Sequence, residues 1–73
     1  MAAERRHAVQ KAIHSLPHEL REAVILSSYH DMTQAQIAKV QDTTEKAVEV
    51  RLYRARKMLR DLLADTLNEG THS

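Results

Sequence analysis

The sequence predicts an all-α fold: a four-helix domain in which the last helix is long. Three observations support this prediction. Good helix formers dominate the composition, above all Ala, Leu, Glu, Arg, Lys and Gln. The chain has one Gly and one Pro, whereas hairpins and barrels use such residues at their turns. With 73 residues and no Cys, it is at most one domain, and its core must come from Leu, Ile, Val, Ala and Met.

An amphipathic first helix is predicted from Ala2 to Ser15, because apolar residues recur there at three- and four-residue steps: Ala8, Val9, Ala12 and Ile13. Pro17 separates it from a second helix, since the residue before a proline avoids helical angles. Pro17 suits the first turn of that second helix, which puts Ser15 or Leu16 at its boundary. The second helix should run to about Tyr29, with a buried stripe made of Leu20, Ala23, Val24, Leu26 and Ser27.

A short third helix is predicted from Gln34 to Val40, and Thr33 is a good N-cap for it. Gln36 completes a T-x-x-Q capping box, in which two backbone N–H groups at the helix start are satisfied together. The residues of this helix that should face the core are Ile37, Ala38 and Val40.

The tetrapeptide Gln41-Asp42-Thr43-Thr44 is expected to be a turn, because Asp tolerates left-handed backbone angles better than most residues other than Gly. Thr44 or Thr43 should cap a fourth helix that runs from about Glu45 to Leu63 or slightly beyond. One seam of this helix should face the core: Val48, Leu52, Ala55, Leu59 and Leu62. The domain is therefore expected to cover residues 1–67, followed by a polar, disordered tail at residues 68–73.

The short helix, tight turn and long helix together have the pattern of a helix-turn-helix, a DNA-binding motif. From Arg51 to Arg60 there are five basic residues and no acid, although the net charge of the chain is only +1. If Val48 and Leu52 point inward, the opposite side of the helix presents Lys46, Val50, Tyr53 and Lys57, flanked by Arg54 and Arg60. An α-helix fits the major groove of B-DNA, and its N-terminal residues reach the base edges first.

The residues in the first two turns of this helix are therefore candidates for base contacts: Lys46, Ala47, Glu49, Val50 and Arg51. Lys or Arg can donate to guanine, Ala47 and Val50 can contact a thymine methyl, and Glu49 can accept from a cytosine amino group or simply favour the positive end of the helix. Arg51 lies near the core boundary and can extend its head group outward. Arg54, Lys57 and Arg60 are better placed for phosphates.

Other classes of function find little support in the sequence. No apolar run approaches the roughly 20 residues of a transmembrane helix, and no secretion signal is evident, so we expect a cytoplasmic protein without a membrane partner. His7, His14, His18 and His72 lack the close pairing of a zinc site. There is no Cys nucleophile and no recognisable grouping of Ser, His and acid, so we expect neither an enzyme nor a cofactor.

An ordered set of motifs resembles region 4 of bacterial sigma factors, most closely the extracytoplasmic-function (ECF) group. The resemblance extends from about Ile13 to Leu63, and a lone Arg-Ala-Arg would be much weaker evidence than the set. The matching segments are Leu16-Pro17, Glu19-Leu20-Arg21-Glu22-Ala23, Ile25-Leu26, Met32-Thr33, Gln36-Ile37-Ala38, Ala47-Val48, Arg51-Leu52, Arg54-Ala55-Arg56 and Leu59.

This resemblance implies binding to the minus-35 promoter element, docking on the β flap of RNA polymerase, and occlusion by an anti-sigma factor. It places Lys46, Ala47, Glu49, Val50, Arg51 and Arg54 at DNA-facing positions. The sequence departs from the family pattern at Glu49, where Lys or Arg is usual, and at Val50, where Ser is common. Gln41 and Thr43 are polar where the turn is usually aliphatic. Region 2 is missing, so we do not expect this chain alone to be a complete sigma factor.

Two other interpretations stay open from the sequence. One is the output domain of a LuxR-type regulator, whose "T-V-E-V" helix is similar to Ala47-Val48-Glu49-Val50, although the Leu-Pro and Arg-Ala-Arg segments favour sigma. The other is a sigma-like interaction module that binds an anti-sigma factor and no DNA. Glu49 and the low net charge are compatible with this second alternative.

Overall fold

The computed structural model describes the backbone of residues 2–71 and the side-chain surroundings of residues 5–64. It contains four helices: α1 (Ala2–His14), α2 (His18–Ser28), α3 (Gln34–Val40) and α4 (Glu45–Thr71). No strand occurs in the described part of the chain, which confirms the predicted all-α fold with a long last helix.

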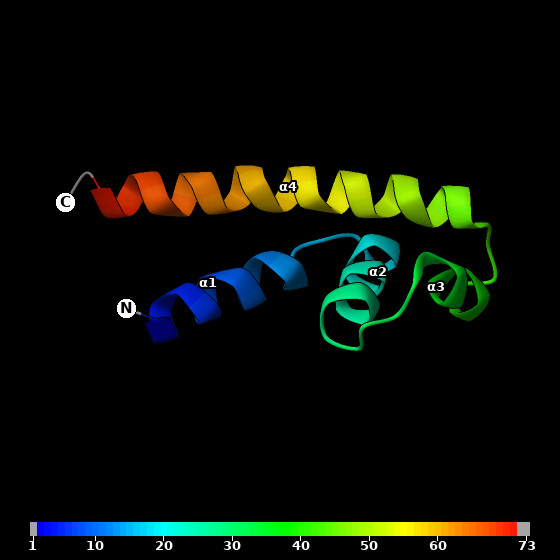
Figure 1. The fold of residues 1–73 in the computed structure, drawn as a ribbon. Helices are drawn as coiled ribbons and strands as arrows, with labels where there is room; N and C mark the ends of the chain where they lie inside the picture. The colour runs from blue at the N-terminus through cyan, green and yellow to red at the C-terminus, as the bar shows by residue number, and fades with distance from the viewer. Residues whose placement is uncertain (1, 72–73) are drawn as a thin grey trace.

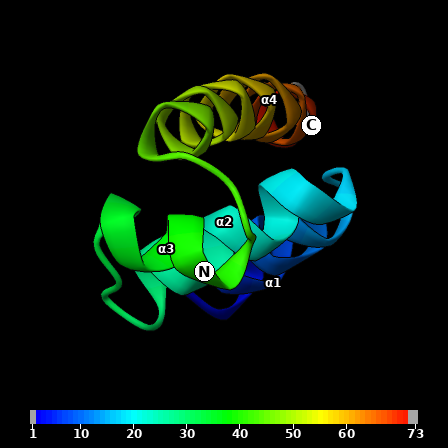
Figure 2. The same ribbon diagram turned by 90° about the vertical axis from the view of Figure 1, so that its right-hand side faces the viewer.

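The helices form two layers, with α4 in one and the three shorter helices in the other (Figures 1 and 2). Helix α1 lies antiparallel beside the C-terminal half of α4, whereas α2 and α3 lie beneath its N-terminal half (Figure 1). At 1.5 Å per residue, the 27 residues of α4 span about 40 Å, which accounts for most of the 45 Å length of the molecule. Helix α4 is therefore the element against which the other three are arranged.

The break between α1 and α2 lies where the sequence predicts it, but the helix boundary is shifted. Pro17 is itself the N-cap of α2, with an extended backbone (φ −52°, ψ 148°), so it precedes the first turn instead of lying in it. Its carbonyl accepts the first helical hydrogen bond, from the Arg21 N–H at 2.9 Å. The prediction that Ser15 or Leu16 forms this boundary is therefore wrong by one or two residues.

The third helix has the predicted bounds and the predicted cap. The Gln36 N–H donates to Thr33 Oγ1 at 3.2 Å, and the Thr33 N–H donates to Gln36 Oε1 at 2.9 Å. This reciprocal pair is the capping box expected from the sequence. It fixes where the chain enters the helix-turn-helix.

The turn after α3 is a Schellman motif that contains Asp42 in place of the usual glycine. Asp42 has a φ of 52°, the Thr43 N–H donates to the Ala38 carbonyl at 2.9 Å, and the Asp42 N–H donates to the Lys39 carbonyl at 3.3 Å. Thr44 then caps α4, since its Oγ1 accepts from the Ala47 N–H at 3.1 Å. The left-handed turn predicted at Asp42 is thus confirmed, and Thr44 is the cap.

One apolar core joins all four helices. Its buried members are Ile13, Leu16, Ala23, Val24, Ile37, Ala38, Val48, Leu52 and Ala55. Ile37 and Val48 are its largest fully buried side chains, which confirms the seam between α3 and α4. The small residues Ala23, Ala38 and Ala55 allow the helix backbones to approach one another closely.

Two residues predicted to face the core are more exposed than expected. Val40 is 54% exposed, because it lies at the end of the seven-residue α3 and is rotated away from the Ile37–Ala38 edge. Leu62 keeps the angular position of the seam but is 36% exposed. Only α1 lies beside that part of α4, so there is less protein to cover it (Figure 1).

Helix α4 continues past the predicted end near Leu63 and finishes at Thr71. Residues 68–71 of the predicted tail are therefore helical, while His72 and Ser73 lie outside the described residues. The domain boundary at residue 67 stays a prediction.

Candidate nucleic-acid interface

The outward face of α4 is the surface that the sequence identifies as a DNA-binding face. Val48, Leu52 and Ala55 point toward the layer of α1, α2 and α3, so the opposite side of the helix is left free. Its exposed residues within the described part of the chain are Lys46, Glu49, Val50, Tyr53, Arg54, Lys57 and Arg60. In Figure 2 this side of α4 lies away from the other three helices, at the edge of the molecule.

The first two turns of α4 combine charges of both signs with apolar groups. Lys46 Nζ lies 3.5 Å from Glu49 Oε2, and both side chains are mostly exposed. An exposed pair of this kind contributes at most about 1 kcal/mol to stability, but it neutralises the charge of this part of the face. Val50 is 37% exposed on the outward side, as predicted, whereas Ala47 is half-buried beside Thr44.

The positive charge of the face is concentrated farther along the helix. Arg54, Lys57 and Arg60 are exposed and form no ion pair within the described residues. Tyr53, which is 67% exposed, lies among them. Cations that are not engaged elsewhere can each replace a counterion on a phosphate, so this half of the face is suited to a nucleic-acid backbone.

A helix-turn-helix with a basic outward face on its second helix is typical of several families of DNA-binding proteins. A comparison with protein-family models distinguishes between them: the model described as "Sigma-70, region 4" matches residues 6–59. The chain belongs to the sigma-70 region 4 family. This family supplies the promoter-binding module of sigma factors, which also contacts RNA polymerase and is not a catalytic domain. The match includes α2, α3, the turn and α4 as far as Leu59, so it contains the turn of the helix-turn-helix and the N-terminal half of its second helix.

Arg51 is the candidate residue whose position differs most from the sequence-based expectation. Only 22% of its side-chain surface is exposed, and its guanidinium is turned toward α2. Nη1 donates to Gln41 Oε1 at 2.8 Å, and Nη2 lies 3.5 Å from Glu19 Oε2. Arg51 is therefore engaged with α2 and with the C-cap of α3, whereas the ion pair of Lys46 is with Glu49 on its own helix.

Gln41 completes this group, which we call the polar bridge: Glu19, Glu22, Gln41 and Arg51. Gln41 Nε2 donates to the Glu19 carbonyl at 3.0 Å and to Glu22 Oε1 at 3.1 Å. The polar bridge thus joins α2, the end of α3 and α4. The polar bridge was not predicted from the sequence. The available signal was a glutamine at a turn position that is usually aliphatic, ten residues before an arginine at the edge of the core seam.

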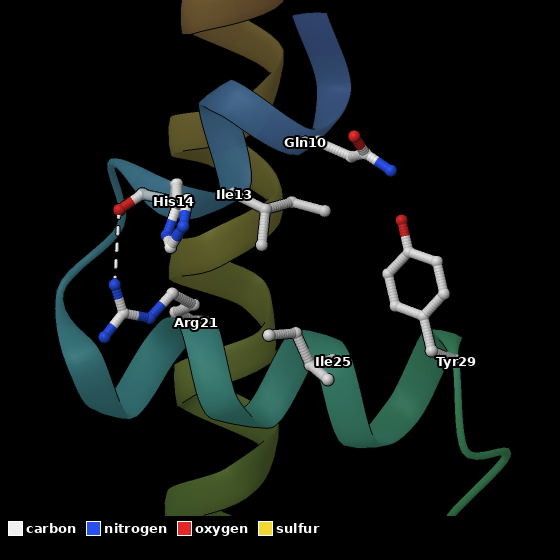
Figure 3. A pocket seen from close by; sticks show the side chains of 6 residues that line it. All are labelled: Gln10, Ile13, His14, Arg21, Ile25 and Tyr29. Atoms are coloured by element: carbon white, nitrogen blue, oxygen red, sulfur yellow. Dashed lines mark hydrogen bonds between the residues drawn. The ribbon is translucent and has the colours of Figure 1, made fainter. Parts of the chain in front are cut away.

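A cleft between α1 and α2 is a second surface feature of the region 4 domain (Figure 3). It has a volume of about 490 Å³ and is lined by Gln10, Ile13, His14, Arg21, Ile25 and Tyr29. Ile13 and Ile25 lie in its middle, with Gln10 and Tyr29 toward one end and His14 and Arg21 toward the other. Arg21 Nη1 donates to the His14 carbonyl at 3.4 Å, a long bond that joins the two helices. In this view α4 passes behind α1 and α2.

No helix in the described part of the chain is both long enough and apolar enough to span a membrane.

Proposed function

We propose that this domain binds the minus-35 promoter element as region 4 of an ECF sigma factor, with α4 in the major groove. The observation that carries the proposal is the division of α4 into two faces. The core seam fixes one face against α1, α2 and α3, and the opposite face presents polar and basic side chains at the helical spacing needed to follow a groove. The ECF assignment is supported by the ordered motifs from Leu16-Pro17 to Leu59.

Within this proposal the two halves of the outward face have different roles. The first two turns, with Lys46, Ala47, Glu49 and Val50, contact base edges, where donors, acceptors and methyl groups distinguish one base pair from another. Arg54 and Lys57 contact phosphates, which fix the register of the helix on DNA without sequence information. Their exposure supports this division, as does the absence of ion pairs between them and the described part of the chain.

The polymerase contact of the proposal is assigned to the cleft between α1 and α2. The cleft is lined by residues of α1 and α2 and by Tyr29, the C-cap of α2, so a protein segment bound there leaves the outward face of α4 free for promoter DNA. The proposed occupant is the β flap, held by apolar contact with Ile13 and Ile25 and by hydrogen bonds to groups at both ends of the cleft. An anti-sigma factor would oppose the same function, and the proposed site of action is the cytoplasm.

The DNA contact is tested by replacing Arg54 or Lys57 with Ala and measuring affinity for promoter duplexes over a range of salt concentrations. Each substitution should weaken binding to all sequences alike and reduce the slope of log K against log salt by about one unit. Arg6→Ala is the matched control, because it removes the same charge from an exposed position on α1. If Arg54→Ala and Lys57→Ala behave like Arg6→Ala while the fold is intact, the proposed DNA contact is wrong.

A second candidate is a sigma-like interaction module that binds an anti-sigma factor without binding DNA. The Lys46–Glu49 ion pair favours it, because a carboxylate in the first turns of α4 repels phosphate and occupies the nearest cation. The same titrations distinguish the two candidates. A pure interaction module would show no salt-dependent affinity for any duplex, in the parent or in the variants.

A further inference from the structure

We propose that Arg51 is a positioning residue: together with Gln41 and Glu19 it sets the angle of α4 against α2, and it does not itself contact DNA. This inference rests on the proposed function for its DNA-binding consequences, but the polar bridge can also be tested without DNA. It gives Arg51 a different role from Arg54 and Lys57, which lie on the same helix.

The bonds of Arg51 are those of a side chain held in place. The 2.8 Å contact between Nη1 and Gln41 Oε1 is a short, charge-assisted hydrogen bond, and Nη2 is directed toward the Glu19 carboxylate at 3.5 Å. Lys46, in the same two turns, has 79% of its side-chain surface exposed, against 22% for Arg51. To reach a base or a phosphate, Arg51 would have to lose both contacts and leave Gln41 Oε1 without its donor.

The orientation of the Gln41 amide is fixed because hydrogen-bond acceptors lie beside its NH₂ group and a donor lies beside its oxygen. Its NH₂ group donates to two acceptors on α2, the Glu19 carbonyl and Glu22 Oε1. Its oxygen accepts from Arg51. Rotating the amide by half a turn would place donor against donor and acceptor against acceptor, so one orientation is strongly preferred. Gln41 is also the C-cap of α3, directly before the left-handed Asp42.

The polar bridge lies where the angle between the helices is decided. The remaining interface between α2 and α4 is apolar, and apolar contact has little directional preference. Hydrogen bonds weaken steeply when donor and acceptor are misaligned, so a bridge from Glu19 through Gln41 to Arg51 adds an angular restraint to this packing. Base contacts from the early turns of α4 depend on small displacements, and they are expected to be sensitive to the loss of this restraint.

The first test measures the affinity of the chain for a duplex that the parent itself selects from a random-sequence pool. The variants are Arg51→Met, which keeps an unbranched apolar stem without the guanidinium, and Gln41→Met, which keeps side-chain length without the amide. Their double mutant completes the set, and Lys57→Met is the phosphate-contact control. Arg51→Met and Gln41→Met should each weaken binding about tenfold, and the double mutant should be no weaker than either single mutant. The salt slope should stay at its parent value in all three and fall by about 0.9 in Lys57→Met.

The opposite result would overturn the proposal. If Arg51→Met lowers the salt slope by about 0.9 while Gln41→Met leaves affinity unchanged, Arg51 contacts a phosphate directly. Arg51→Lys gives a further comparison, because Lys keeps the charge for a phosphate but cannot form the two-pronged contact with Gln41 and Glu19. Rescue of affinity by Arg51→Lys would likewise contradict a positioning role.

The second test needs no DNA. Residual dipolar couplings of backbone amides give the angle between α2 and α4 in the parent, Gln41→Met and Lys57→Met, with circular dichroism to establish that helix content is kept. The angle should change in Gln41→Met and stay at the parent value in Lys57→Met. If the parent binds no duplex, the proposed function is wrong. The angle between α2 and α4 in Gln41→Met still shows whether the polar bridge positions α4. An unchanged angle in Gln41→Met would overturn the proposal whatever the DNA result.

Discussion

The two faces of α4 differ in what determines their residues. The inward face is apolar and buried, with Val48, Leu52 and Ala55 packed against α1, α2 and α3. The outward face mixes a Lys–Glu ion pair, exposed apolar groups and cations that form no ion pair with the described residues. Both faces lie on one regular helix, so helix formation itself does not explain the difference.

Comparing the two faces of α4 shows where core packing restricts the choice of residue and where a binding partner can do so. An inward residue must match the shape and polarity of the core, because a polar or smaller group there lowers the stability of the fold. An outward residue has no such requirement, since substitutions at exposed sites usually change stability by less than about 0.5 kcal/mol. Core packing therefore leaves charge and side-chain type on the outward face unconstrained, and under the proposed function they follow the DNA.

The largest expected effect comes from truncating a side chain on the inward face, compared with truncating its neighbour on the outward face. Leu52→Ala should lower the free energy of unfolding by about 2–5 kcal/mol, because Leu52 is buried and its removal leaves a cavity in the shared core. For 73 residues the total stability is only about 4–11 kcal/mol, so much of it would be lost. Tyr53→Ala, one residue farther on the exposed face, is the matched control and should change stability little. Equal melting temperatures for Leu52→Ala and the parent would contradict the division into faces.

The inward face was predictable from the sequence, because apolar spacing and caps are local signals. The bounds of α3, its capping box and the left-handed Asp42 all follow from residue types within a few positions of one another. The exposure of Val40 and Leu62 was not predictable in the same way, since it depends on where neighbouring helices end. The polar bridge was also missed, because it joins Glu19, Gln41 and Arg51 from three separate segments.

The candidate site was predictable only as a face. Helical spacing identified which side of α4 is outward, and the exposure of Lys46, Val50 and Lys57 agrees with it. From spacing alone, Arg51 and Arg54 were both predicted to be DNA-binding residues, since both are arginines near that face. Their bonding partners differ, and these depend on the tertiary structure.

The next largest effect is expected in the first turns of the outward face, on the affinity for DNA and on the preferred base. Glu49→Lys removes the partner of Lys46 and adds a cation, so non-specific affinity for DNA should rise. A carboxylate only accepts hydrogen bonds, whereas Lys donates, so the preferred base at one position should change by about 1–3 kcal/mol of discrimination. Selection from a random-sequence pool with the parent and the variant measures both effects. Identical selected sequences would show that Glu49 supports the helix and does not contact bases.

A smaller effect is expected at the turn that determines which face of α4 points inward. Asp42 has a φ of 52°, where Gly is unstrained and a residue with a β-carbon is disfavoured. Asp42→Gly should therefore be more stable than Asp42→Ala by about 1 kcal/mol, as measured by urea denaturation of the two variants. Equal stabilities would mean that the residue does not adopt the left-handed conformation in solution.

The smallest effect is expected at Val40, which tests whether α3 has the same contrast between a buried and an exposed face. Val40 is 54% exposed, whereas Ile37, one turn earlier, is fully buried. Val and Ser have similar helix propensities, so Val40→Ser should change the free energy of unfolding by less than about 0.5 kcal/mol. Ile37→Ala, the control on the buried side, should lower it by about 2–5 kcal/mol. If Val40→Ser instead lowers the free energy of unfolding to a similar extent, Val40 contacts the core in solution, and the inward face of α3 is wider than the structure shows.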